Sequence, residues 1–313
     1  MNIKKVLLLG GSGFIGASIA DQLSSHGFFV TVPTRLRERA KHLLILPTID
    51  IVEADVHDPE SLLALVREHD AVINLIGILH GDFEREHAEF PKLVAETCVT
   101  ANVPRLLHMS ALNADINGPS KYLQSRGRGE ANVLAVAKAN PELKVTIFQP
   151  SVVFGEHDKF LNMFVGLVQK FPFIPLGSAD AKFQPVWVED VARAFAQSVN
   201  NSETFGKTYP LVGPKIYTLQ QLIEFVIPLT GKLRLVIGLG KGLSMLQATV
   251  FEFLPGKLIT RDNVRSMSLP NISPTPFPAI FGTASDMETV VPTYMRDGTG
   301  REKYQALRNS AGR

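Results

Sequence analysis

Three glycines spaced three residues apart, directly after an apolar run, constrain this chain more than any other feature. The run Val6–Leu9 leads into Gly10, Gly13 and Gly16. A tight turn from strand to helix, a close approach of backbone to pyrophosphate, and close packing of the helix on the strand each require a missing Cβ atom. The helix N-terminus then directs unpaired N–H groups at the anion. The sequence therefore predicts a dinucleotide-binding loop made of Gly10, Ser12, Gly13, Phe14, Ile15 and Gly16.

The segments around this loop supply the context that the motif requires. The apolar run before it predicts a strand, the residues after Gly16 predict a helix, and residues 28–32 predict the next strand. This order makes the motif specific, whereas the glycines alone would be weak evidence. A glycine turn that holds no ligand is the alternative interpretation, and the context favours the dinucleotide.

Short apolar runs alternate with longer amphipathic stretches through the first half of the chain, which is typical of strand and helix units around a parallel sheet. Asp58 before Pro59 indicates one helix start, since an acidic N-cap followed by proline is a favoured beginning. Residues 183–200 predict one more strand and helix that return to this part. We expect strands at residues 5–9, 28–32, 50–53, 71–75, 106–109 and 145–149.

The alternation of apolar runs and amphipathic stretches ends after Pro150, and prolines become frequent. Residues 217–229 and 242–254 predict helices there. The predicted fold is α/β: a doubly wound parallel sheet of the Rossmann type with a second, smaller, mostly helical C-terminal domain. The expected division is 1–154 with 184–212 for the dinucleotide-binding Rossmann domain, 155–183 with 213–296 for the small substrate or partner domain, and 297–313 for a mobile basic tail.

Composition and charge narrow the class of protein. With 45% hydrophobic and 20% charged residues, the 313-residue chain has an ordinary globular composition. A net charge of +2 is too small to supply the field that a polynucleotide needs, so we expect no nucleic acid partner. Cys98 is the only cysteine, which excludes an intramolecular disulfide and is typical of a small buried residue in a reducing compartment.

No stretch approaches the ~20 consecutive apolar residues that a membrane span needs. The run Val6–Leu9 is also too short for the apolar core of a signal peptide. We therefore expect a cytoplasmic protein without a transmembrane segment, and we leave peripheral contact with the inner membrane open. The apolar stretch 235–258 is most simply interpreted as a buried layer that covers the small domain. The alternative is an apolar pocket or a membrane-facing surface for a quinone or isoprenoid.

The residues after the second predicted strand favour NADP(H) over NAD(H). NAD-selective domains carry an acidic residue there, but in this chain Pro33 and Thr34 are followed by Arg35. A guanidinium group matches a 2′-phosphate with bidentate geometry, so Arg35 predicts the phosphorylated cofactor. A solvated helix start is the alternative for this arginine and for Arg37 and Arg39 after it. NAD(H) stays the second choice of cofactor.

Two later strand ends supply further candidate contacts. Asp55 follows the third predicted strand and is well placed to meet the adenine edge. Asn74, Ile76 and Gly77 close the fourth strand, near the expected position of the adenosine ribose. We therefore include these four residues in the predicted cofactor site.

These motifs resemble the short-chain dehydrogenase/reductase superfamily in its extended or atypical branch, through the glycine loop, Asp55–Val56 and the segment 74–77. A narrower resemblance, over about residues 3–265, is to the nucleotide-binding accessory subunits of NADH:ubiquinone oxidoreductase (complex I) and their bacterial relatives. It is carried by residues 108–114, 121–122, 149–155 and 184–192. The resemblance implies a dinucleotide ligand and a respiratory-chain or quinone-biosynthesis complex as partner. It adds Val56 and Pro150 to the cofactor contacts.

Enzymes of the superfamily use a serine, a tyrosine and a lysine four residues after the tyrosine. The resemblance places Ser110 and Tyr122 in the first two roles, but Arg126 stands where the lysine is expected. One helical turn still puts a cation beside the phenol. Arginine, however, cannot give up a proton at ordinary pH. Ser110, Tyr122 and Arg126 are therefore the candidate catalytic residues, and enzymatic turnover is left open.

Three functions fit these residues. A nucleotide-binding protein that supports a respiratory or quinone-handling assembly is favoured by Arg126. An active NADP(H)-dependent reductase, dehydrogenase or epimerase is kept open by Ser110 and Tyr122, although both could be structural residues retained from an ancestor. A free sensor of cofactor redox state would use the same binding site.

Glu84, His87 and Glu89 come nearest to a metal-binding cluster. We interpret this charged stretch as a solvated helix face, so no metal site is predicted.

Overall fold

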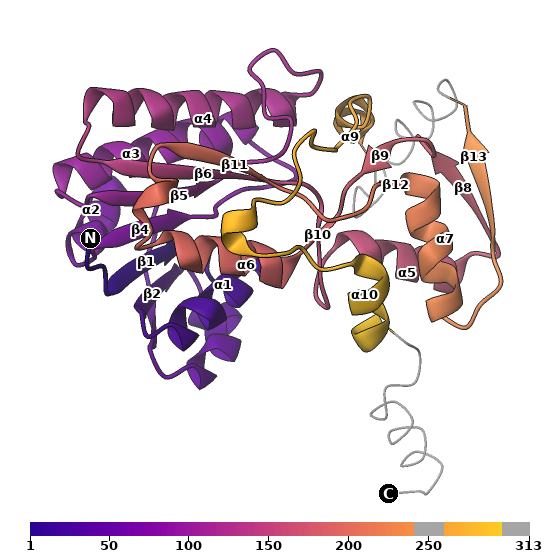
Figure 1. Cartoon of the computed structure of the whole chain (residues 1–313), viewed down its shortest axis with the longest axis horizontal. Coiled ribbons are helices and arrows are strands. Elements are labelled where there is room, and N and C mark those ends of the chain that lie inside the picture. The colour runs from indigo at the N-terminus through magenta and orange to yellow at the C-terminus, as the bar shows by residue number, and fades with distance from the viewer. Residues whose placement is uncertain (241–259, 296–313) are drawn as a thin grey trace, which may run out of the picture.

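A seven-stranded parallel sheet forms the core of the larger part of the molecule, as the sequence predicts (Figure 1). The computed structural model describes residues 1–240 and 260–295. The strands run in the order β11-β6-β5-β4-β1-β2-β3, and each neighbouring pair is parallel. Their bounds are Lys5–Leu9 for β1, Phe29–Thr34 for β2, Ile49–Glu53 for β3, Ala71–Asn74 for β4, Arg105–Met109 for β5, Lys144–Pro150 for β6 and Lys207–Leu211 for β11.

Six of these strands lie within two residues of the predicted ranges. The seventh, β11, was not predicted as a strand, because Pro210 interrupts its pattern and proline cannot donate to a central ladder. β11 is the edge strand beside β6, where a missing N–H on the outer side is tolerated.

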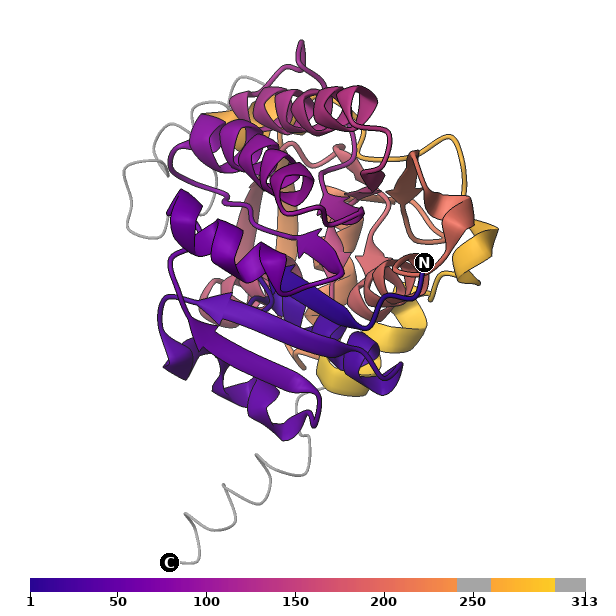
Figure 2. The same ribbon diagram turned by 90° about the vertical axis from the view of Figure 1, so that its left-hand side faces the viewer.

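Helices cover both faces of the sheet (Figures 1 and 2). On one face, α1 (Phe14–Ser25) packs against α6 (Val188–Ser198), and their apolar side chains share a core with the sheet. On the other face, a row of three helices buries a second apolar cluster, with side chains from α2 (Pro59–Arg67), α3 (Phe90–Thr100) and α4 (Lys121–Ala139). The doubly wound architecture expected from the sequence is therefore present.

Two helix starts follow from local hydrogen bonds. The predicted N-cap at Asp58 is confirmed, because its carboxylate accepts the N–H of Ser61 at 3.0 Å and Pro59 occupies the first turn. The helix predicted at 217–229 is α7 (Leu219–Leu229), which begins two residues later. Thr218 forms a capping box at that point and fixes the start.

The segment predicted as a strand and helix at 183–200 is only partly as expected. The helix is α6, which returns to the sheet. The strand is β10 (Val186–Trp187), which pairs with β7 (Val153–Phe154) outside the main sheet.

A third apolar cluster forms the core of the remaining part of the molecule. It contains α7, the helix predicted at 217–229, and two helices that no predicted range covers, α5 (Phe160–Lys170) and α10 (Met287–Met295). It also contains short strand pairs that the sequence did not indicate, β8 (Phe173–Gly177) with β13 (Leu235–Leu239), and β9 (Lys182–Phe183) with β12 (Tyr217–Thr218). The predicted helix at 242–254 and the predicted basic tail at 297–313 lie outside the described residues.

The chain returns to the sheet near its C-terminal end. Phe277 and Phe281 are buried in the same cluster as Phe148 and Phe195. The rings of Phe281 and Phe148 lie 5.9 Å apart. Downstream, the N–H of Ser285 donates to the buried carboxylate of Asp190 in α6 at 2.6 Å. Residues 277–285 thereby complete the core on the α6 face.

Candidate functional site

The predicted cofactor residues meet at the edge of the sheet where the parallel strands end. Gly10, Arg35 and Asp55 follow β1, β2 and β3, while Asn74 and Pro150 are the last residues of β4 and β6. From β1 the chain extends the sheet to one side with β2 and β3, and to the other side with β4, β5 and β6. Open sheets of this kind bind ligands outside the strand ends at such a switch point.

The glycine loop has the geometry that its spacing predicts. Gly10 adopts a φ of +84°, which residues with side chains rarely adopt. A Cβ atom at Gly16 would lie 2.3 Å from the carbonyl oxygen of Gly10, so the start of α1 packs directly on the turn. At the exposed Gly13, a Cβ atom would meet only this same oxygen, at 3.4 Å. The loop thus presents bare backbone where a pyrophosphate would approach.

The N-terminus of α1 is open to an anion. Gly13 is the N-cap residue, and no described side chain caps this helix. The first N–H groups of a helix have no partner within it and, with the helix dipole, attract a phosphate. Ser12, Phe14 and Ile15 are half-buried around this end. These residues fit the pyrophosphate of a dinucleotide.

Arg35 is exposed directly after β2 and has no hydrogen bond or ion pair with another described residue. The hydroxyl of Thr34 bonds to the carbonyl of Leu36 at 3.1 Å, which shapes the turn into the short helix η1 (Arg37–Ile45). No acidic residue lies between β2 and η1. The guanidinium of Arg35 therefore has no partner among the described residues, and its contact with a 2′-phosphate stays a prediction.

The other predicted contacts divide into exposed and buried residues. Asp55 is exposed, and its carboxylate accepts a backbone N–H two residues further on, at 3.0 Å. Asn74 is buried and accepts the N–H of Ile76 at 3.1 Å, which shapes the loop after β4. Val56 packs in the apolar core beside α2, and Pro150 is buried at the end of β6. Asp55 and the loop after β4 are thus the parts most open to a ligand.

Ser110, Tyr122 and Arg126 lie together where β5 ends beneath α4. Nη1 of Arg126 donates to the carbonyl oxygen of Met109 at 3.2 Å. Cζ of Arg126 lies 5.5 Å from the centre of the Tyr122 ring, so the expected cation stands beside the phenol. The guanidinium also lies against Gly77, where a Cβ atom would stand 2.1 Å from Nη2. Arg126 is only 5% exposed, so its charge is held inside the site.

Glu130 and Gln149 belong to the same cluster but were not among the predicted site residues. Nε2 of Gln149 donates to both carboxylate oxygens of Glu130, at 2.9 and 3.0 Å. Burial raises the pKa of Glu130, while the nearby hydroxyl of Ser110, the Gln149 amide and the charge of Arg126 act in the opposite direction. Tyr122, Arg126 and Glu130 follow at intervals of four, which places them on one helix face. This spacing is the sequence signal that could have found Glu130.

Three buried polar atoms near the end of β5 have no hydrogen-bond partner among the described residues: His108 Nε2, Ser110 Oγ and Arg126 Nε. The Ser110 hydroxyl is close enough to Glu130 to stabilise its charge, but it lacks hydrogen-bond geometry. His108 Nδ1 faces the amide nitrogen of Asn74 at 3.4 Å, which assigns the ring proton to Nε2. Buried polar groups are normally satisfied, so these atoms indicate a place for water or the polar part of a ligand.

The interpretation of Glu84, His87 and Glu89 as a solvated helix face is wrong for the histidine. Glu84 and Glu89 are exposed, but His87 is fully buried. Its ring stacks on Phe83 and meets the edge of Tyr122 because the short π-helix η2 (Arg85–Glu89) packs against α4. The described residues contain no cluster that could hold a metal ion.

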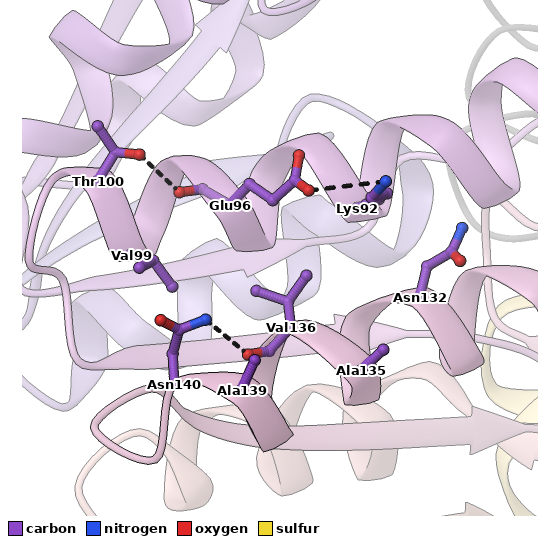
Figure 3. A pocket seen from close by; sticks show the side chains of 9 residues that line it. All are labelled: Lys92, Glu96, Val99, Thr100, Asn132, Ala135, Val136, Ala139 and Asn140. Atoms are coloured by element: carbon purple, nitrogen blue, oxygen red, sulfur yellow. Dashed lines mark hydrogen bonds and ion pairs between the residues drawn. The ribbon is translucent and has the colours of Figure 1, made fainter.

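A shallow hollow of about 560 Å³ lies elsewhere, between α3 and the C-terminal half of α4 (Figure 3). The Lys92–Glu96 ion pair borders it on α3, and Val136 and Ala139 border it on α4. This part of α4 lies beyond Glu130, away from the helix turn that carries Tyr122. The hollow is therefore separate from the candidate dinucleotide site.

Comparison with known proteins gives a family match for the first two thirds of the chain and relatives that align over most of it. Residues 6–211 match the family described as NAD dependent epimerase/dehydratase family. The chain is 30% identical over 284 residues to NADH dehydrogenase (ubiquinone) 1 alpha subcomplex subunit 9, mitochondrial, of Mus musculus, covering 87% of this chain and 74% of the relative. The protein of the same name from Arabidopsis thaliana is 33% identical over 232 residues, covering 70% of this chain and 56% of the relative.

Solved structures confirm the fold. DesIV, a dTDP-glucose 4,6-dehydratase from Streptomyces venezuelae solved with NAD and TYD bound, matches with a TM-score of 0.66 at 20% identity. The match covers 76% of this chain and 85% of that one. Among the described residues, no helix combines the length and the apolar character that crossing a membrane requires.

Proposed function

Because this chain belongs to the NAD dependent epimerase/dehydratase family, we propose that it holds a nicotinamide dinucleotide on the loop around Gly13. The observation that carries the proposal is the bare backbone at Gly13, beside an uncapped helix N-terminus. We propose NADP(H) in preference to NAD(H), and the exposed, unpaired Arg35 supports this choice. Asp55 and the loop of Ile76 and Gly77 would line the adenosine part.

We also propose that the protein serves a membrane-associated respiratory or quinone-related assembly, at the periphery of the inner membrane. The support is its similarity to the mouse and Arabidopsis proteins, whose names describe them as NADH dehydrogenase subunits. The small domain of residues 155–183 and 213–296 would face the partner or substrate.

The chemistry of Arg126 favours a protein that binds the cofactor without catalysing its turnover. A bound dinucleotide would supply hydride transfer. Arg126 provides a fixed positive charge, but a guanidinium keeps its proton at ordinary pH and this one is tied to the Met109 carbonyl. It can therefore orient and stabilise neighbouring groups, but it cannot relay a proton as a lysine would.

A reductase, dehydrogenase or epimerase activity is the second candidate function. It is favoured by the unpartnered hydroxyl of Ser110 and by the position of Tyr122 beside a cation. In that case Tyr122 would exchange a proton with a substrate oxygen, and Ser110 would stabilise the developing charge.

The direct test is titration of the full chain with NADPH and NADH, together with Gly13→Val. The valine would project from the exposed loop into the pyrophosphate position, so nucleotide binding should be lost while the protein stays folded. Gly166→Val is the matched control, because Gly166 also faces open space but lies in α5. Unchanged NADPH affinity in Gly13→Val would show that this loop is not the phosphate site.

A further inference from the structure

His87 lies where three elements that frame the candidate site meet: the loop after β4, the short helix η2, and α4. Its Nε2 accepts the backbone N–H of Ile78 at 2.9 Å. On the other side of the ring, Nδ1 lies 3.0 Å from the hydroxyl of Ser125. That hydroxyl donates to the carbonyl of Tyr122 at 2.8 Å. A continuous chain of hydrogen bonds therefore joins the loop to the helix turn that carries Tyr122.

The donor and the acceptor of each hydrogen bond in this series can be assigned. A backbone N–H can only donate, so Nε2 of His87 carries the lone pair and Nδ1 carries the proton. Nδ1 then donates to Ser125, which in turn donates to Tyr122. Burial, followed by the charges of Arg126 and His108, lowers the pKa of His87 to about 3, which keeps this neutral form. A second proton on the ring would remove the acceptor for Ile78.

Packing leaves the imidazole little freedom. Its ring meets Tyr122 edge to face, with centroids 5.4 Å apart and an angle of 88°. Phe83 stacks on the ring at the same centroid distance, with an angle of 14°. The backbone is equally close, because a Cβ atom at Gly129 of α4 would stand 1.9 Å from the carbonyl oxygen of His87. Such π-helical turns often occur at functional sites.

We propose that His87 is a positioning residue. It fixes the position of the loop of Ile76, Gly77 and Ile78 relative to the helix turn of Tyr122. The effect on nucleotide binding rests on the proposed function, since that loop is where the ribose is placed. The position of this loop is a property of the protein without nucleotide, so it can be measured in the free protein. His69 provides a control, because it is also a buried histidine whose ring nitrogens contact one backbone group and one hydroxyl, but it lies before the start of β4 rather than after its end. Its Nδ1 lies 2.6 Å from the carbonyl of Leu65 and its Nε2 lies 2.7 Å from the hydroxyl of Thr31.

The experiment compares His87→Asn, His87→Gln and His69→Asn in the full chain. Glutamine can place an acceptor near the Nε2 position, whereas asparagine reaches only to Nδ1. The amide of Ile78 should exchange with deuterium about tenfold faster in His87→Asn, as expected for the loss of one hydrogen bond, and at a nearly unchanged rate in the other two variants. The same rate in wild type and His87→Asn, or an equal increase in His69→Asn, would overturn the proposal.

Titration with NADPH separates this proposal from the proposed function. His87→Asn should weaken NADPH binding by about tenfold, while His87→Gln and His69→Asn should retain it. If NADPH binds wild type and His87→Asn equally, His87 does not position the loop for a nucleotide. If wild type binds no NADPH but Ile78 exchange still responds to His87→Asn, the proposed function fails and the positioning role stands.

A measurement on the wild type covers the case in which the asparagine variant does not fold. Nitrogen-15 shifts of the His87 ring should show a protonated Nδ1 and a bare Nε2 throughout the range of about pH 5 to 8 in which ordinary histidines titrate. A protonated Nε2 in the neutral ring would overturn the proposal.

Discussion

Gly77 and Arg126 occupy adjoining space, since a Cβ atom on Gly77 would stand 2.1 Å from Nη2 of the arginine. The missing side chain on the loop after β4 lets a buried guanidinium reach from α4 to the carbonyl of Met109. The loop that we propose to contact the ribose therefore packs directly against the arginine at the position where the superfamily enzymes have lysine.

Gly77→Ala should displace this guanidinium and weaken its bond to Met109. We expect a loss of about 1 to 3 kcal/mol in the free energy of unfolding, the usual range for overpacking, measured by chemical denaturation. In an Arg126→Ala background the same substitution should cost much less, because the colliding group is gone. Equal costs in the two backgrounds of this double-mutant cycle would contradict the contact.

Arg35→Ala should weaken NADPH binding and leave NADH binding almost unchanged. The expected loss is about 1.5 to 3 kcal/mol, the value of a hydrogen bond to a charged group, measured by equilibrium titration. Arg67→Ala is the control, because Arg67 is an exposed arginine at the end of α2, away from the strand ends. Equal losses for both nucleotides would remove the assignment of Arg35 to a 2′-phosphate.

Single-turnover oxidation of bound NADPH distinguishes holding from catalysis. With a panel of carbonyl and quinone substrates, we expect slow or absent hydride transfer in the wild type, and a gain in Arg126→Lys if a substrate pocket persists. A working enzyme would instead lose about 100- to 10,000-fold of its rate in Tyr122→Phe, the contribution of general acid catalysis. Rapid wild-type turnover that disappears in Tyr122→Phe would overturn the preference for a binding role.

The two buried imidazoles of His87 and His108 should make the fold sensitive to acid. Burial, and then the charge of Arg126, lowers the pKa of each from 6.5 to about 3. At pH values between these two pKa values, both histidines bind a proton in the unfolded chain but not in the folded protein. Stability should therefore fall as the pH decreases from 6.5, by about 1.4 kcal/mol per pH unit for each histidine.

Denaturation curves of His87→Gln and the wild type, recorded from about pH 7 to 4, check this expectation over the range in which histidines titrate. The substitution should remove one histidine's share of the slope. His42→Gln, which changes an exposed histidine away from the buried rings, is the control substitution. A slope that does not respond to His87→Gln would rule out the buried neutral ring.

Local patterns explain what could be predicted from the sequence. The glycine loop and the strand ends depend on residues that are neighbours in the chain, and the parallel order then brings Gly13, Arg35 and Asp55 to one edge. Cys98 is fully buried as expected, and burial raises the pKa of its thiol to about 12. Its environment follows from the apolar residues around it on α3.

The features that were missed depend on contacts between distant segments. His87 stands among charged residues in the sequence, and only the close approach of α4 at Gly129 buries it. Glu130 lies in the site because Gln149, from the following strand, reaches its carboxylate. β11 depends on pairing with β6 at the edge of the sheet, which its own sequence does not reveal.

The return of residues 277–285 to the sheet has a consequence for synthesis of the chain. Phe281 contacts Phe148 and Tyr209, so the aromatic core around the sheet contains a segment that is translated after all seven strands. Domains usually fold from the N-terminus as they emerge. Here all seven strands can emerge and pair while one side of their core still lacks its cover. Until residues 277–285 have left the ribosome, the ring of Phe281 cannot take its place against Phe148, so the core on the α6 face is completed only after the strands have formed.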